Sequence, residues 1–293
     1  MIASNNTKEL GAAHIGLGTM KKILLATLVA VSAQITFANP STTANQDVDP
    51  QFTQIEKLVT QKNFKGAYDA LSKLANQGNA QAIYNLGYLT QTGQGTVKNE
   101  KKAIELYEKS AKLGYPVANY VLGKNYTAGT LGLKQDIPKA KQYLERASAA
   151  NFDDATIDLA VLLFAESKPE SDKLALAKIN PLITKGNFQA IHVKALYDIS
   201  GGIKNKDEKG VQKGLSSIQE LAKKGYTPAL MAIGNVLANG NLVEQNLPEA
   251  KKIFAALAKE NVPQAKESLA AVEKMMAEQA KAPSQQPTGQ KKS

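Results

Sequence analysis

The chain has 293 residues, a formal net charge of +10 and 43% hydrophobic residues, so it can bury a sizeable core. It contains no cysteine and two histidines, which excludes disulfides, thiolate catalysis and iron–sulfur clusters and leaves little basis for a multi-histidine metal site. We therefore expect no cofactor and no metal ion. Arg146 is the single arginine among 36 basic residues. Because bidentate contacts to bases and phosphates favour arginine, we expect no nucleic-acid partner.

The N-terminal segment has the features of an export signal. Two lysines follow Met20, an apolar run occupies residues 23–31, and small residues lead to Ala38. A charged start, a short apolar run and a small residue at the cut predict a signal peptide over residues 20–38, cleaved after Ala38 or alternatively after Ala33. The apolar run is too short to span a membrane stably, so no transmembrane segment is expected in the mature protein.

Residues 1–19 precede this signal, and we interpret them as a mis-assigned extension ahead of a true start at Met20. The signal, with no cysteine at the cut, predicts a periplasmic protein, or alternatively a secreted one. Residues 39–48 are expected to form a flexible leader and residues 281–293, rich in Pro, Gln, Ser and Lys, a disordered tail. The dispersed lysines predict solubility and weak attraction to anionic envelope surfaces.

A repeat of about 36 residues organises the chain between residues 49 and 280. An alanine recurs at intervals of 36, 37, 35, 39 and 36 residues, at Ala82, Ala118, Ala155, Ala190, Ala229 and Ala265. The residue five positions after each alanine is Gly or Ala, and the residue four positions after it is large and aliphatic in five of the six units. This spacing places the three residues on one face of a helix, which we call helix A.

A second set of small residues lies between these alanines. A bulky residue stands four positions after each, and a glycine or asparagine stands eleven positions after each, at Gly78, Gly114, Asn151, Gly186, Gly225 and Asn261. Because Gly and Asn tolerate the left-handed conformation that ends a helix, this set predicts a second helix, helix B, that stops there. A hairpin of two such helices cannot bury its apolar face alone, so successive hairpins are expected to stack.

The connections between helices A and B also repeat. Gly93 and Gly95 suit a tight turn, and a phosphate-binding role for them is disfavoured because a third glycine and a preceding strand are missing. Two units depart from the pattern. The unit from Ala155 has lost the loop glycines, and the unit from Ala190 is expected to carry a longer, charged loop over Gly201–Gly210.

Residues 79–115, 118–152 and 229–262 are the three best copies of the unit. In the first copy the motif comprises Ala82, Leu86-Gly87, Gly93-Gln94-Gly95-Thr96-Val97, Lys102-Ala103, Tyr107, Ala111 and Gly114. These copies resemble the Sel-one-like repeat (SLR) family, a relative of the tetratricopeptide repeats. The resemblance implies an all-α, right-handed superhelical α/α solenoid of about six helix hairpins over residues 49–280. For exported bacterial members it implies a non-enzymatic protein–protein interaction scaffold or adaptor of the cell envelope.

Helix A supplies the candidate binding residues. By analogy with tetratricopeptide-like arrays, this helix lines the concave side, and the positions two and six after each repeat alanine face inward. The candidates are Tyr84, Tyr88, Tyr120, Lys124 and His192. Tyrosines are common binding anchors, so a protein or peptide partner is expected in this groove. The alternative, slightly favoured for tyrosines two positions after the alanine, is packing in the core, whereas Tyr88 and Lys124 are expected to be more exposed.

Few residues suggest catalysis. His192, the single histidine after the predicted cleavage sites, is interpreted mainly as an ordinary helix residue. Asp154 and Asp158 are one helical turn apart and could face a substrate, but we favour Asp153 and Asp154 as helix caps and Asp158 as a solvated residue. The common hydrolase signatures are absent from the sequence. We therefore expect no enzyme activity. The alternatives are a cell-wall-related hydrolase or glycan or β-lactam binder, and a secreted effector.

Overall fold

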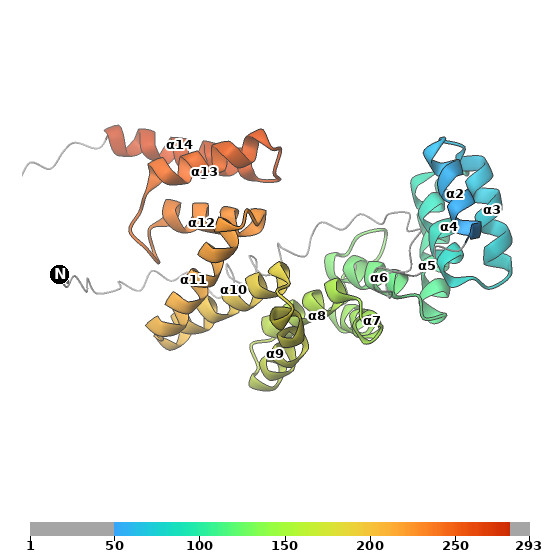
Figure 1. Cartoon of the computed structure of the whole chain (residues 1–293), viewed down its shortest axis with the longest axis horizontal. Helices are drawn as coiled ribbons and strands as arrows, with labels where there is room; N and C mark the ends of the chain where they lie inside the picture. The colour runs from blue at the N-terminus through green and yellow to red at the C-terminus, as the bar shows by residue number, and fades with distance from the viewer. Residues whose placement is uncertain (1–49, 282–293) are drawn as a thin grey trace, which may run out of the picture. The chain divides into compact units, whose positions relative to one another are not determined.

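The computed structural model describes residues 50–281, so the expected extension, signal peptide and leader, and nearly all of the expected tail, lie outside the described residues. Within that range the chain forms thirteen helices and no strand (Figure 1). The helices are α2 (Pro50–Thr60), α3 (Phe64–Asn76), α4 (Ala80–Thr92), α5 (Glu100–Lys112), α6 (Pro116–Ala128), α7 (Ile137–Ala149), α8 (Asp153–Ala165), α9 (Pro169–Thr184), α10 (Phe188–Asn205), α11 (Glu208–Lys223), α12 (Thr227–Asn239), α13 (Leu247–Lys259) and α14 (Ala265–Lys281).

Neighbouring helices pack as hairpins in chain order, which confirms the predicted all-α solenoid of helix pairs. Residues 50–190 and residues 191–281 form two compact units. In the first unit, α4, α6 and α8 are A helices, each followed by its B helix. In the second unit, α12 and α13 form such a pair, and α14 packs against both of them. None of the helices in the described range is long and apolar enough to cross a membrane.

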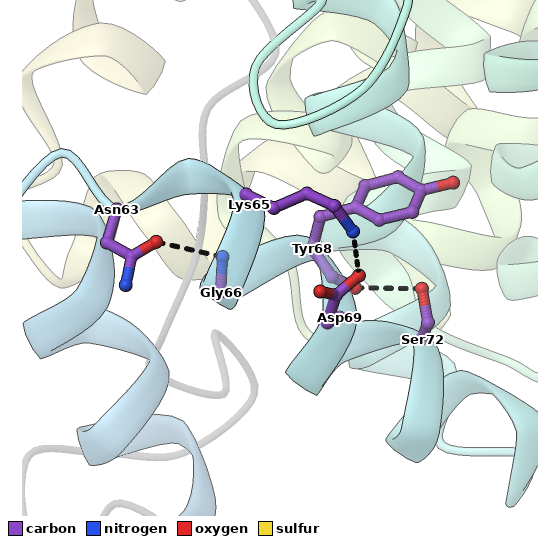
Figure 2. A network of polar contacts seen from close by, with 6 residues as sticks. All are labelled: Asn63, Lys65, Gly66, Tyr68, Asp69 and Ser72. Carbon is purple, nitrogen blue, oxygen red and sulfur yellow. Dashed lines mark hydrogen bonds and ion pairs between the residues drawn. The ribbon is translucent and has the colours of Figure 1, made fainter.

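Asparagine and aspartate side chains cap the start of four B helices. In α3, α5, α7 and α13 the N-cap side chain accepts a hydrogen bond of 2.9 to 3.0 Å from the backbone N–H three residues later, at Asn63, Asn99, Asp136 and Asn246. Figure 2 shows the first of these caps, in which Asn63 Oδ1 faces the Gly66 amide. Such a cap stabilises a helix by about 1 kcal/mol. These side chains therefore fix where each of the four helices begins.

The predicted ends of the B helices are confirmed. All six predicted residues have a positive φ, between 55° and 88°, the left-handed conformation that closes a helix. Three of the A helices, α4, α6 and α12, end in the same conformation at Gly93, Gly129 and Gly240. Glycine is needed at Gly95 for a further reason, because a Cβ there would lie 2.2 Å from the Phe64 carbonyl oxygen at the start of α3.

The tiny residue of helix A receives the bulky residue of helix B. A Cβ added at Gly87 would lie 2.9 Å from the Tyr107 ring. The same relation holds at Gly123 with Leu144, at 2.8 Å, and at Gly234 with Phe254, at 2.6 Å. The two sequence registers therefore meet inside these three hairpins, and the missing side chain allows the two helices to approach closely.

The unit from Ala190 differs from its prediction. The loop expected over Gly201–Gly210 is wrong, because α10 continues to Asn205 and α11 begins at Glu208. Close packing requires a glycine at position 202 of α10. A Cβ there would lie 2.7 Å from Val211 Cγ2 and 2.8 Å from the Asp207 carbonyl oxygen. The glycine pair read as a loop signal is thus partly a packing signal.

Candidate functional site

The five predicted binding residues lie on A helices, but in two different units. Tyr84 and Tyr88 are on α4, and Tyr120 and Lys124 are on α6, all in the first unit. His192 is on α10, in the second unit. The structure brings Tyr120 and Lys124 together, one turn apart on the same helix, with Lys124 Nζ 5.9 Å from the centre of the Tyr120 ring.

Tyr84 is a core residue. Its side chain is fully buried, and its ring lies 5.3 Å from that of Tyr107 and 5.5 Å from that of Tyr115. These three rings join α4, the following helix α5 and the start of α6. The packing interpretation therefore describes Tyr84 well, and a partner cannot touch its ring while the hairpin is folded.

Lys124 is buried, with 8% of its surface exposed, so the expectation that it would be among the more exposed residues is wrong. The reason is Asp158 on α8, whose Oδ2 lies 3.1 Å from Lys124 Nζ. The Tyr120 hydroxyl donates a hydrogen bond to the same carboxylate, and the Tyr120 ring packs 4.9 Å from that of Phe152. Tyr120, Lys124 and Asp158 thus form one buried polar cluster between consecutive A helices, which we call the α6–α8 cluster.

The interpretation of Asp158 as a solvated residue is also wrong, since only 3% of its surface is exposed. Asp153 and Asp154 lie in the first turn of α8, but Phe152 occupies the N-cap position and no side chain caps this helix. The sequence held a signal for this arrangement. Asp158 is the single charged residue in the apolar run 155–165, and a buried charge requires a partner.

Burial dominates the electrostatics of the α6–α8 cluster. It raises the pKa of the Asp158 carboxyl, while the Lys124 charge and hydrogen bonds from Lys124 and Tyr120 act in the opposite direction. Burial, the nearby Asp158 charge and then Asp154 raise the pKa of the Tyr120 phenol. Burial and the neighbouring Asp153 raise the pKa of Asp154. We assign Asp158 as the ionised partner of Lys124, because its oxygen meets the ammonium group directly.

This arrangement favours a structural role for the α6–α8 cluster. The carboxylate is enclosed and engaged by a cation and a hydroxyl, so it joins α6 to α8. Among residues 50–281, no group of three His, Asp or Glu side chains is placed to hold a metal ion.

The other two predicted residues have different surroundings. Tyr88 is half-buried and packs at the edge of the apolar cluster that includes Leu86 and Leu89. His192 is buried, with 4% of its surface exposed, and its ring meets the edge of the Tyr226 ring at 5.6 Å. Within the described residues, its Nδ1 has no hydrogen-bond partner. Burial lowers the pKa of His192 to about 4, so it is neutral at pH 7.

Helix pairs that are closed by Gly or Asn and packed on a tiny residue define an SLR α/α solenoid. The Sel1 repeat family matches residues 80–115, 116–152 and 227–262, the same three units that carry the best sequence motifs. These three segments of the chain are therefore Sel1 repeats.

Two solved structures share the fold. One is a protective antigen present in uropathogenic Escherichia coli strains, with a TM-score of 0.56 and 24% identity, covering 71% of this chain and 44% of that chain. The other is a Sel1 repeat protein from Oxalobacter formigenes, with a TM-score of 0.54 and 23% identity, covering 71% of this chain and 84% of that one. Both are bacterial Sel1 repeat folds, and at this identity they support the fold alone.

A curated relative is chitin synthase regulatory factor 3 from Schizosaccharomyces pombe, 29% identical over 97 residues. The match covers 33% of this chain and 10% of the relative. The chain thus spans about a tenth of the length of that protein.

Proposed function

We propose that the protein is an exported, non-enzymatic scaffold of the bacterial cell envelope that binds a protein or peptide partner on the face formed by its A helices. Sel1 repeats are typically protein-interaction modules and are usually non-catalytic. The name of the fission-yeast relative, a regulatory factor, agrees with a role exerted on another protein. The predicted signal peptide supports export, to the periplasm or alternatively to the outside of the cell.

The observation that carries this proposal is the burial of the A helices α6 and α8 together with the ion pair that joins them. Eleven of the thirteen residues of α6 are buried, and ten of the thirteen of α8. The α6–α8 cluster fixes the relation between the two helices. A surface built on such a frame is preformed, so a partner can bind without the free-energy cost of ordering it.

We divide the roles within the proposed site according to burial. Tyr88, half-buried at the edge of α4, can offer its side chain to a partner. Tyr84, Tyr120 and Lys124 are buried, and we assign them to holding the shape of the A-helix face. Removing the charge of Lys124 would leave the buried Asp158 carboxylate unpaired and would also affect folding. A substitution at Lys124 therefore cannot test binding separately from stability.

The test is affinity capture from the native periplasm with the tagged full chain. Tyr88→Ala should reduce recovery of the partner while leaving the helical circular dichroism signal unchanged. Leu113→Ala is the matched control, because Leu113 is 52% exposed at the end of the B helix α5. Equal recovery with both variants would remove Tyr88 from the site.

A second candidate function is a cell-wall-related hydrolase or a glycan or β-lactam binder. One observation favours it: two carboxyls one turn apart, Asp154 and Asp158, have raised pKa values beside a tyrosine. Purified protein should then hydrolyse peptidoglycan or a β-lactam, and Asp154→Asn should abolish the hydrolysis without loss of helicity. A lack of turnover and of glycan or β-lactam binding would leave the scaffold proposal as the better account.

A further inference from the structure

Val97 is 84% exposed, more than any other large apolar residue among residues 50–281. It lies in the loop between α4 and α5, two residues before Asn99, the N-cap of α5. The residues two before the N-caps of α7 and α13 are Lys134 and Glu244, which are charged and exposed. The fold thus directs this position into solvent, and the first loop places an apolar side chain where the other two place a charge.

Packing within the repeat does not account for Val97. The packing role falls to the residue one position earlier in each loop. Leu133 and Val243, three residues before their N-caps, are half-buried, and Leu133 packs against the apolar cluster that contains Tyr107. Their counterpart in the first loop is Thr96, which is half-buried as well. The exposed valine is therefore free to meet something outside the chain.

The loop that carries Val97 is held against the start of α3, since a Cβ at Gly95 would lie 2.2 Å from the Phe64 carbonyl oxygen. The equivalent loop after α6 has Leu131 and Leu133 packed against the apolar cluster that contains Ala103, near the start of α5. Because the two loops hold equivalent places in successive repeats, they and the helix starts beside them form one edge of the first unit. We call residues 61–66, 96–102 and 130–136 the basic edge.

The basic edge carries six lysines and two acidic residues. Glu100 is paired with Lys98 at 2.8 Å, and Asp136 caps α7. Lys65 is paired with Asp69 of α3 at 2.5 Å, as Figure 2 shows. The other four lysines are exposed and form no ion pair with any of residues 50–281, and they are Lys62, Lys101, Lys102 and Lys134.

An apolar side chain that projects among free lysines complements the surface of an anionic lipid bilayer. Each lysine close to such a surface is attracted by the lipid phosphates, and an apolar residue can enter the headgroup region. A folded acidic protein would need a hollow for Val97 and carboxylates spaced to match the four lysines. A bilayer offers both contacts without a fixed geometry, so the projecting valine and dispersed free charges favour lipid.

We propose that the basic edge binds the surface of an anionic lipid bilayer, with Val97 in the headgroup region and the four free lysines meeting lipid phosphates. The inference goes beyond the proposed function, because it concerns a lipid surface rather than a protein partner and does not involve Tyr88. It would hold the protein at a membrane surface without a helix that spans the bilayer.

The test uses tryptophan fluorescence of the full chain, which contains no tryptophan of its own. Val97→Trp places the reporter on the basic edge, and Leu113→Trp places it at a 52% exposed position just after α5. Vesicles of equal parts phosphatidylcholine and phosphatidylglycerol should shift the emission of Val97→Trp to the blue, and brominated acyl chains should quench it. Leu113→Trp should show neither effect, and vesicles of phosphatidylcholine alone should leave both variants unchanged.

Two pairs of lysine substitutions test the charge. Lys101→Gln with Lys102→Gln, added to Val97→Trp, should raise the lipid concentration for a half-maximal shift at least about tenfold, since each lysine at an anionic surface contributes about fivefold. Lys73→Gln with Lys109→Gln removes the same charge from exposed positions in the last turns of α3 and α5. This control should change the half-maximal concentration by about twofold at most, because charges away from the bilayer are screened.

The native valine is tested without a reporter. Val97→Ser, in the otherwise unaltered chain, should weaken co-sedimentation with the phosphatidylglycerol vesicles about threefold, because a serine gains little from leaving water. Leu113→Ser is the matched control and should sediment as the unaltered chain does.

Three outcomes would overturn the proposal. The first is an emission of Val97→Trp that responds to the vesicles as that of Leu113→Trp does, which would assign any lipid binding to other segments. The second is an equal effect of the two lysine pairs. The third is an equal blue shift with a hepta-glutamate peptide, which would assign the basic edge to an acidic polypeptide. None of these outcomes alters the effect of Tyr88→Ala on partner capture, so the two proposals fail separately.

Discussion

The buried pair of Lys124 and Asp158 is the least expected feature at the scale of single residues. The repeat register placed Lys124 on a surface and left Asp158 in solvent, whereas both are buried and paired. Periodicity assigns a residue to a helix face but does not say which neighbouring helix covers that face. The useful signal was chemical, because a lone acid in an apolar run needs a partner and the preceding A helix carries a lysine.

We predict that Asp158→Ala lowers the free energy of unfolding by about 3–5 kcal/mol, because it leaves the Lys124 ammonium buried without a counter-charge. Denaturant titration followed by far-UV circular dichroism measures the change. The double variant Lys124→Met with Asp158→Asn removes both charges and keeps an acceptor for the Tyr120 hydroxyl. It should recover most of the loss. A cost below about 1 kcal/mol for Asp158→Ala would show that the pair contributes little.

His192 gives a prediction of pH dependence. Burial lowers its pKa to about 4 from an ordinary value of 6.5, so the unfolded chain binds a proton at higher pH than the folded chain does. Its contribution to the free energy of unfolding is therefore constant above about pH 7 and falls as the pH drops from about 6.5 to about 4, by at most roughly 3 kcal/mol.

Comparison of the unaltered chain with His192→Gln, at several pH values, isolates this contribution. The stability difference between the two should shift in favour of the variant as the pH falls through that window. A difference that stays constant from pH 7 to pH 4 would contradict the burial of a neutral imidazole.

At the scale of helices, most of the fold could be predicted from the sequence. The two small-residue registers and the six Gly or Asn residues located the B-helix ends, because each reflects a backbone or packing requirement of its own. The prediction failed at Gly201-Gly202, where glycine was read as a turn. The requirement at Gly202 comes from contact with Val211, a residue nine positions later, and local reading cannot detect such a contact.

Three glycine-to-alanine substitutions separate these causes. Gly123→Ala should destabilise by about 1–3 kcal/mol, because the new methyl group would lie 2.8 Å from Leu144. Gly214→Ala should cost at least as much, since its methyl group would lie 2.6 Å from the Ala195 carbonyl oxygen, a backbone atom. Gly201→Ala meets nothing within 4 Å and should be neutral or stabilise α10 by about 0.5–1 kcal/mol. Thermal melts of the three variants give the ranking, and a stable Gly214→Ala would contradict the close approach of α10 and α11.

At the scale of the whole molecule, the repeat indicates the kind of function but does not identify the partner. Three units match the Sel1 repeat family, and the units between them keep the helix pairs while losing the motif. The buried clusters described above hold neighbouring helices together, as a scaffold that offers its surface to a partner requires.

Export makes a prediction about the mature chain. N-terminal sequencing of protein recovered from cells should begin at Asn39, or at Gln34 if cleavage follows Ala33. No peptide from residues 1–19 should occur in the precursor if translation begins at Met20. Recovery of such a peptide would contradict the start at Met20, and recovery of an uncleaved chain from the cytoplasm would contradict the proposed export.

The central claim is that the A-helix face binds a protein partner, and photo-crosslinking in living cells tests it most directly. A photoreactive amino acid would replace Tyr88 in the full chain, and in a matched strain Leu113. The account predicts a discrete crosslinked product from position 88, recovered in the periplasmic fraction and weak or absent from position 113. Equal labelling from both positions, or no product from position 88, would contradict it.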